Sequence, residues 1–292
     1  MNTHASRLRT GLSRAFLLAI TLLFALPAAV PDAWSQVAAG AAGDVGDYTT
    51  GRLSLARTGT FEVWQDTTRL GSEFYRVYAS PKGDSLIAVS NVRYELRERG
   101  GLTTYEKRTL EIVRALDAFP LLLQSQETIG GRERSVTVGF RDGNALIFRE
   151  VGSSGQAHVV GVPPGRLHLL DPNVYEHVES LVSDFWGRGL ASRAQNVLMT
   201  PRDTVIQVRL TRGPQETVEG PGRRPLKATR VDIFDDLTLI KTWLDDQGLM
   251  VRLEAPAQKL RVVRLAPGKP EAEAASSAIP GRAPAKGTAP TR

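Results

Sequence analysis

The chain has 292 residues, with 37 Lys or Arg against 31 Asp or Glu, a formal net charge of +6 and no cysteine. The absence of cysteine excludes a disulfide scaffold and a lipid-anchored thiol. Basic and acidic residues are interleaved along most of the chain, which is typical of a solvated surface, so we expect no nucleic-acid partner.

The N-terminal 35 residues have the pattern of a cleavable signal peptide. Arg7, Arg9 and Arg14 precede an apolar run over residues 15–26, and a small-x-small cleavage site ends at Ser35. A helix needs about twenty apolar residues to span a bilayer, and this run is shorter. We therefore predict a signal peptide over 1–35, a periplasmic or secreted protein, and no integral membrane segment after cleavage. The alternative is an uncleaved N-terminal anchor.

The remaining chain divides by composition into three parts. Residues 36–47 are rich in Ala and Gly and are expected to be a flexible leader. Residues 266–292 repeat Pro, Ala, Gly and Ser with almost no large apolar side chain, which predicts a disordered tail. Residues 48–265 have the length of one antiparallel β domain.

Within this domain, short runs rich in Val, Ile, Phe, Tyr and Thr alternate with Gly, Asp, Asn and Pro, which is the pattern of strands joined by turns. Residues 142–144 and 245–248 contain the Asp, Asn and Gly that tight hairpins need, so neighbouring strands should be antiparallel. The predicted strands are Phe61 with Val63, the alternating set Phe74, Arg76 and Tyr78, and residues 86–94, 105–113, 121–128, 134–140, 145–151, 204–211, 227–234, 237–244 and 249–254.

One segment has helical spacing instead. Asp171 is expected as its N-cap, Pro172 as its first helical residue and Gly187 as its stop. The spacing places one apolar face on Val174, Val178, Leu181, Val182 and Phe185, and directs Glu176, Glu179, Ser180, Ser183 and Asp184 away from the sheet. The predicted fold class is mostly β: a curved antiparallel sheet or half-barrel with one covering helix.

No stretch carries a recognisable catalytic, cofactor or metal motif. The mature chain has three histidines, His158, His168 and His177, and none has a metal-ligand spacing to another. His177 is expected as a partly buried structural residue at the edge of the helix's apolar face. The Gly/Ser run at 152–155 is interpreted as a turn, not a nucleophile motif. We predict no enzyme, no cofactor and no metal.

Aromatic residues are spread over the predicted strands and helix. In a curved sheet under one helix they could line an apolar cavity, whereas in a flat sandwich they would fill a core. Both interpretations stay open. The candidate lining residues are Trp64, Phe74, Tyr78, Phe148, Phe185 and Trp243.

The last hairpin carries a resemblance to known proteins. Residues 242–254, TWLDDQGLMVRLE, resemble the W-[VL]-D-x-x-G-x-[VL] strand-turn-strand of exported bacterial β domains of unknown function, with Met250 departing from the pattern at its last position. Residues 68–74, TRLGSEF, are similar to the opening hairpin of that group. The resemblance implies a half-barrel like that of the periplasmic lipoprotein carriers, although this chain has fewer predicted helices than the carriers. It implies no catalytic residues.

Three functional hypotheses follow. The leading one is an exported, non-enzymatic β protein that binds a lipid or other apolar envelope ligand in the concavity of its sheet. The first alternative is a structural or protein-interaction module of the cell envelope, with an envelope protein as partner and no cavity. The second is a hydrolase, which requires a polar pocket gathering His158, His168 or His177 with a carboxylate and a hydroxyl.

Overall fold

The computed structural model describes residues 53–98, 101–235 and 237–267. The strands are β1 (Ser54–Gln65), β2 (Thr68–Ala79), β3 (Ser85–Glu98), β4 (Gly101–Arg114), β5 (Pro120–Ile129), β6 (Arg132–Arg141), β7 (Asn144–Val151), β8 (Ser154–Gly161), β9 (Leu167–Leu170), β10 (Ser192–Met199), β11 (Thr204–Glu219), β12 (Pro225–Asp235), β13 (Thr238–Leu244), β14 (Met250–Ala255) and β15 (Leu260–Arg264). The helical elements are α4 (Tyr175–Gly187) and the 3-10 turns η1 (Thr200–Arg202), η2 (Pro221–Arg223) and η3 (Pro256–Gln258).

All the described strands belong to one sheet. Its order is β8-β7-β6-β5-β4-β3-β2-β1-β15-β14-β13-β12-β11-β10-β9, so the first and last strands, β1 and β15, pair at its centre while β8 and β9 are its edges. Within the described chain every pair is antiparallel except β9 with β10, which are parallel. The predicted hairpin turns are confirmed: Asp142 and Gly143 have φ values of 51° and 73°, and Gly248 has a φ of 76°.

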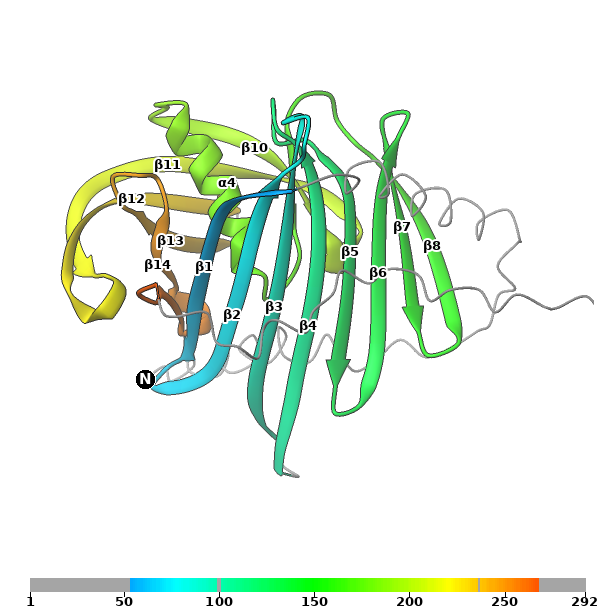
Figure 1. Cartoon of the computed structure of the whole chain (residues 1–292), viewed down its shortest axis with the longest axis horizontal. Helices are drawn as coiled ribbons and strands as arrows, with labels where there is room; N and C mark the ends of the chain where they lie inside the picture. The colour runs from blue at the N-terminus through cyan, green and yellow to red at the C-terminus, as the bar shows by residue number, and fades with distance from the viewer. Residues whose placement is uncertain (1–52, 99–100, 236, 268–292) are drawn as a thin grey trace, which may run out of the picture.

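The sheet is strongly curved. In Figure 1, β1 to β8 form one broad layer, and β10 to β14 curve round so that α4 lies between the two halves. Register shifts interrupt the ladders, and such bulges bend a strand and increase its twist. They lie between Leu55 and Arg57, Val63 and Trp64, Ile112 and Val113, Arg212 and Gln215, and Trp243 and Leu244. The predicted fold class is therefore confirmed, as a sheet that curls without closing.

The two ends of the sheet also pack against each other. Leu167 and Leu169 of β9 and Leu198 of β10 are buried together with Leu123 of β5 and Ile147 of β7. These strands share no ladder hydrogen bonds across the contact. The overlap gives the fold a second apolar cluster beside the one around α4 and packs strands from the two ends of the open, curled sheet against each other.

The helix lies where the sequence predicted it, but its N-cap is different. Val174, not Asp171, is the N-cap residue, and it has no side-chain cap hydrogen bond. The Glu73 carboxyl of β2 instead accepts the backbone N–H groups of Tyr175 (2.7 Å) and Glu176 (3.3 Å). The Asp171 carboxylate turns away to Lys107, whose Nζ is 2.7 Å distant. A residue 102 positions earlier therefore caps this helix, which no local pattern could indicate.

The prediction that Glu176 and Glu179 of the helix point away from the sheet is also wrong. Glu176 and Glu179 are only 1% and 0% exposed. The cause is the curl of the sheet, because the strands that approach α4 from both sides cover its polar face as well as its apolar one. Arg57 of β1 lies 3.0 Å from Glu176 and 3.3 Å from Glu179, and supplies the charge that makes this burial possible.

In strand β2, the side chains that face the helix are not the predicted set of Phe74, Arg76 and Tyr78 but the alternate set. Tyr75 and Val77 are buried in the cluster around α4, together with Glu73. Phe74 is only half-buried, and the Arg76 guanidinium stacks over its ring at 4.9 Å. Both alternating sets contain aromatic residues, so the period alone did not decide which set points inward.

The predicted signal peptide (1–35), the leader (36–47) and all but the first two residues of the tail (266–292) lie outside the described residues. The assignment of 48–265 to one domain stays a prediction. None of the described helices is long and apolar enough to cross a membrane.

Replacing Gly59 by alanine should destabilise the fold. A Cβ at this position would lie 2.5 Å from Nη1 of Arg264 and 2.6 Å from the Tyr75 ring, so the buried contacts of both residues must shift. We expect Gly59→Ala to lower the free energy of unfolding by about 1 to 3 kcal/mol in urea titrations. Gly161→Ala on β8 is the control, because nothing lies within 4 Å of its Cβ, and it should change stability by less than about 0.5 kcal/mol. Equal effects would contradict the close approach at Gly59.

Glu73 should make stability depend on pH. Burial raises the pKa of its carboxyl to about 8, against the lowering effect of the hydrogen bond from Tyr175. The folded state therefore holds a proton that the unfolded state releases near pH 4.5, so the contribution is full below that pH and is lost as pH rises to about 8. We expect Glu73→Gln to gain on the order of 3 kcal/mol relative to the wild type between pH 5 and 8 in denaturant titrations. Glu95→Gln, on the exposed face of β3, should show no such trend.

Candidate functional site

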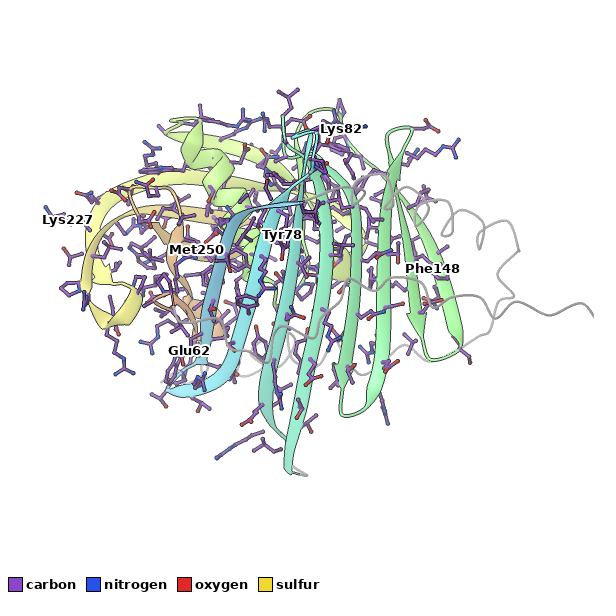
Figure 2. All side chains as sticks on the ribbon, viewed as in Figure 1. Glu62, Tyr78, Lys82, Phe148, Lys227 and Met250 are labelled. Carbon is purple, nitrogen blue, oxygen red and sulfur yellow. The ribbon has the colours of Figure 1, made fainter. Side chains whose placement is uncertain are left out.

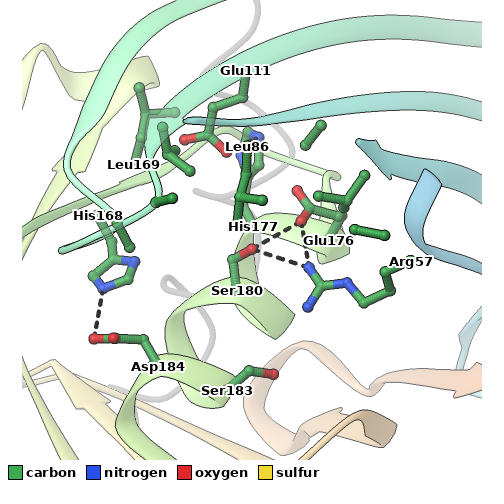
Figure 3. A pocket seen from close by; sticks show the side chains of 16 residues that line it. Arg57, Leu86, Glu111, His168, Leu169, Glu176, His177, Ser180, Ser183 and Asp184 are labelled. Carbon is green, nitrogen blue, oxygen red and sulfur yellow. Dashed lines mark hydrogen bonds and ion pairs between the residues drawn. The ribbon is translucent and has the colours of Figure 1, made fainter. Parts of the chain in front are cut away.

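A cavity of about 340 Å³ lies between the inner face of the sheet and the polar side of α4 (Figure 3). Its apolar wall comes from the strands and consists of Val77, Leu86, Ala88, Val113 and Leu169. Its polar wall includes Glu111 of β4 and, from the helix, Glu176, His177, Ser180 and Asp184. Exposed Ala56 and Ala115 line its outer part, whereas Glu111, Glu176 and His177 are buried at its floor. The cavity is therefore amphipathic and has a polar end remote from solvent.

The floor brings together one strand and the first turn of the helix. Lys107, Thr109 and Glu111 alternate along the inner face of β4, and Glu176 and His177 are consecutive in α4. One ligand atom from each of Glu111, Glu176 and His177 lies within 4.8 Å of the others. The closest recorded pair is His177 Nε2 with Glu111 Oε2, at 3.5 Å.

The histidine in this group has a defined tautomer. The backbone N–H of Asp171 donates to Nδ1 of His177 at 3.1 Å, so in the neutral ring the proton is on Nε2, facing Glu111. Burial lowers the pKa of His177, which favours this neutral form. A metal ion would need the lone pair of Nε2 and a proton on Nδ1, where the donor of Asp171 already points. The three side chains have ligand spacing for a metal, but the hydrogen bonding of His177 does not fit one.

Glu111 and Glu176 differ in how their carboxyl groups are satisfied. Oε1 of Glu176 accepts hydrogen bonds from Arg57 (3.0 Å) and Ser180 (2.8 Å), whereas its Oε2 is buried without a partner. The Glu111 carboxyl has no hydrogen bond to any described residue, apart from the longer contact with His177. Burial raises the pKa of Glu111 well above its usual value, and the charges of Glu176 and Asp171 raise it further. Burial therefore favours the protonated form of Glu111 when no ligand is bound.

A second polar group lies toward the other end of the cavity. Asp184 of α4 accepts a hydrogen bond from Arg166 at 3.1 Å and another from Arg188 at 3.1 Å, and lies 3.5 Å from Nε2 of His168. His168 and Asp184 face each other in Figure 3. Because two arginines share this carboxylate, Asp184 is already satisfied by groups of the chain itself.

The two serine hydroxyls of the cavity are hydrogen-bonded to other groups. Ser180 Oγ donates to Glu176, and Ser183 Oγ donates to the carbonyl oxygen of Gly248 at 2.7 Å. In the part of the chain that the structure describes, neither hydroxyl is hydrogen-bonded to a histidine. The cavity thus gathers histidines, carboxylates and hydroxyls, as the hydrolase hypothesis requires, without pairing a nucleophile with a base. His158 lies apart on β8, 3.8 Å from Asp203.

The structure does not bring the six predicted aromatic residues together, and none of them lines this cavity. Phe185 is buried in the cluster around α4, whereas Trp243 belongs to a separate cluster and donates to Glu216 at 2.9 Å. Tyr78 and Phe148, labelled in Figure 2, lie on β2 and β7, with four strands between them.

The remaining two candidates are half-buried beside arginines. Phe74 contacts Arg76, and the Arg261 guanidinium stacks over Trp64 at 5.4 Å. Ligand binding by the six aromatic residues stays a prediction, but they would have to bind at separate places.

Sequence reasoning missed Arg57, Glu111 and Glu176 as site residues. A signal did exist for Glu111, because it follows Lys107 and Thr109 at every second position of a predicted strand whose inner face is otherwise apolar. For Arg57 no signal existed, since its partners Glu176 and Ser180 are 119 and 123 residues away. For Glu176, the helical period suggested exposure.

No family model and no curated protein matches the chain. Among solved structures it is similar to the β-barrel-like protein of the domain of unknown function DUF1849 from Brucella abortus, with 11% sequence identity and a TM-score of 0.49, over 73% of this chain and 95% of that one. This similarity identifies no family or activity. The β architecture that the resemblance implied is present, whereas export and kinship with lipoprotein carriers stay predictions.

Proposed function

We propose that this chain is an exported, non-enzymatic binding protein that takes up a small amphipathic ligand in the cavity between α4 and the inner face of the sheet. The proposal of export rests on the signal-peptide pattern of residues 1–35. The proposal of binding rests on the cavity, whose presence distinguishes it from a purely structural module with a filled core.

One observation carries the proposal: the floor of the cavity holds carboxyl oxygens that no described group of the chain satisfies. Buried polar atoms in proteins are nearly always hydrogen-bonded, and an exception beside an open volume is explained by a ligand group that completes the hydrogen bond. Oε2 of Glu176 is such an exception, the Glu111 carboxyl has only its 3.5 Å contact with His177, and both residues line an open volume. An apolar wall facing a small number of convergent polar groups is the usual construction of a small-molecule site.

The size of the cavity restricts the ligand. At about 30 Å³ per water-sized group, 340 Å³ holds on the order of 10 to 15 non-hydrogen atoms. Most of the concavity is filled by α4 and the apolar cluster around it. The ligand is therefore a compact molecule with one polar end and not a long acyl chain, although it occupies the concave side of the sheet as the leading hypothesis expected.

A hydrolase is the second candidate, and the gathering of His168, His177, Ser180 and Ser183 around one cavity favours it. It would require Ser183 to exchange its bond with Gly248 for one with a histidine when substrate binds. Turnover of p-nitrophenyl acetate that is abolished by Ser183→Ala would support this candidate over binding alone.

The proposed function is tested by native mass spectrometry of the protein purified from its host without detergent. We expect a bound small molecule that is lost in Ala115→Trp, because the indole would obstruct the exposed mouth of the cavity without entering the core. Ala157→Trp, at an exposed position of β8, is the control and should retain the molecule. A protein that carries nothing and also fails to bind added 1-naphthylmethanol contradicts the proposal.

A further inference from the structure

We propose that the ligand of this cavity carries a primary ammonium group, which binds between the carboxyl groups of Glu111 and Glu176. This inference rests on the proposed function, and it names the chemical class of the ligand.

The floor of the cavity offers two acceptors close together. The ligand atoms of Glu111 and Glu176 lie within 4.8 Å of each other, so one nitrogen between them can donate to both. Oε2 of Glu176 has no hydrogen-bond partner, and the two residues are 5% and 1% exposed. In Figure 3 the two carboxyl groups enter the cavity from opposite sides, one from β4 and one from the helix. An ammonium has three donors and no acceptor, which matches this arrangement.

A metal ion and an anion match the floor less well. A metal would require Nε2 of His177 as an acceptor, whereas the N–H of Asp171 leaves that nitrogen protonated. An anion would require a free cation, but Arg57 is held by Glu176 and Glu179, and Lys107 is held by Asp171 and the Pro172 carbonyl. Arg57, which lines the cavity, and Lys107 nearby on β4 are therefore both already paired.

The neighbouring carboxylates of Glu111 are each paired with a cation, whereas Glu111 is not. Asp171 stays ionised, because Lys107 and its hydrogen bonds outweigh burial and hold its pKa below the usual value. Glu176 shares Arg57 with Glu179, and His177 is neutral. Asp184 is paired with Arg166 and Arg188, and Nε2 of His168 lies 3.5 Å from the same carboxylate. Glu111 is thus the one carboxyl of this described group without a cation.

Binding of an ammonium should therefore release a proton. Burial raises the pKa of Glu111 and so favours its neutral, protonated form when no ligand is bound. An entering cation stabilises the ionised carboxylate, and the proton leaves to solvent, so one positive charge replaces another and the charge of the cavity is unchanged. The affinity for an ammonium then increases with pH until Glu111 is ionised without ligand, whereas the affinity for a neutral analogue does not. Val77, Leu86 and Ala88 contact the apolar body of either ligand.

The test compares two probes that share one apolar body, 1-naphthylmethylamine and 1-naphthylmethanol, by isothermal titration of the purified protein at pH 6 and pH 8. The amine is charged throughout this range. We expect it to bind about tenfold to a hundredfold more tightly than the alcohol at pH 8, as charged hydrogen bonds do. Its affinity should fall at pH 6, and buffers of different ionisation enthalpy should show about one proton released per amine bound.

Two variants locate the effect. Glu111→Gln keeps the shape and a hydrogen-bonding group but cannot become charged, so it should remove the preference for the amine and leave alcohol binding within about twofold. Glu106→Gln, on the exposed face of the same strand, is the matched control and should bind both probes as the wild type does.

Each outcome decides the inference. Equal affinity for the two probes, or an amine preference that persists in Glu111→Gln, overturns the ammonium site while the proposed binding function stands. Failure of both probes to bind overturns the inference together with the proposed function. A preference for the amine that disappears in Glu111→Gln and not in Glu106→Gln supports it.

Discussion

The fold depends on one buried ionic cluster centred on Glu179 of α4. This carboxylate is fully buried, forms an ion pair with Arg264 of β15, lies 3.3 Å from Arg57 of β1, and accepts the hydroxyl of Tyr75 at 2.6 Å. Its Oε2 also accepts the backbone N–H of Met250 at 3.2 Å. The cluster therefore ties the helix to the first and last strands, which pair at the centre of the sheet. Replacing Glu179 by an uncharged residue would leave the buried Arg264 without its carboxylate partner, so the cluster holds the strands in one arrangement.

The cavity is a consequence of that arrangement. Because the helix is drawn into the curve of the sheet, the polar residues one turn before Glu179 are enclosed too. Arg57 satisfies Glu179 and one oxygen of Glu176, and no further described cation reaches Glu111. Elsewhere in the interior the chain supplies counter-charges, as Lys107 does for Asp171. The Glu111 carboxyl and Oε2 of Glu176 thus both line an enclosed volume whose outer part lies among exposed residues.

Local patterns predicted the fold better than the site. Alternating apolar residues and Asp/Gly turns identified most strands, and the helix was located within a few residues of its bounds, because both depend on neighbours in sequence. The predicted N-cap at Asp171 is wrong because its carboxylate is bound by Lys107, Ser125 and Thr200 instead of by the helix. These three residues lie in distant strands or turns. Local patterns also could not decide which side of β2 faces inward, because Phe74 and Tyr75 belong to opposite alternating sets and both sets contain aromatic residues. The set with Tyr75 faces inward, and the Tyr75 hydroxyl donates to Glu179.

By itself, the sequence determined the strand and helix periods, the hairpin positions and the exclusion of disulfide bonds. It also carries the pattern on which the prediction of export rests. Each of these is a property of adjacent residues or of composition. Tertiary structure alone decided that β1 and β15 pair at the centre of the sheet, that a strand side chain caps the helix, and that Glu111 and Glu176 meet in a cavity. These features depend on contacts between residues many tens of positions apart. Their energies come from burial and charge pairing, which exist only after the sheet has curled around the helix.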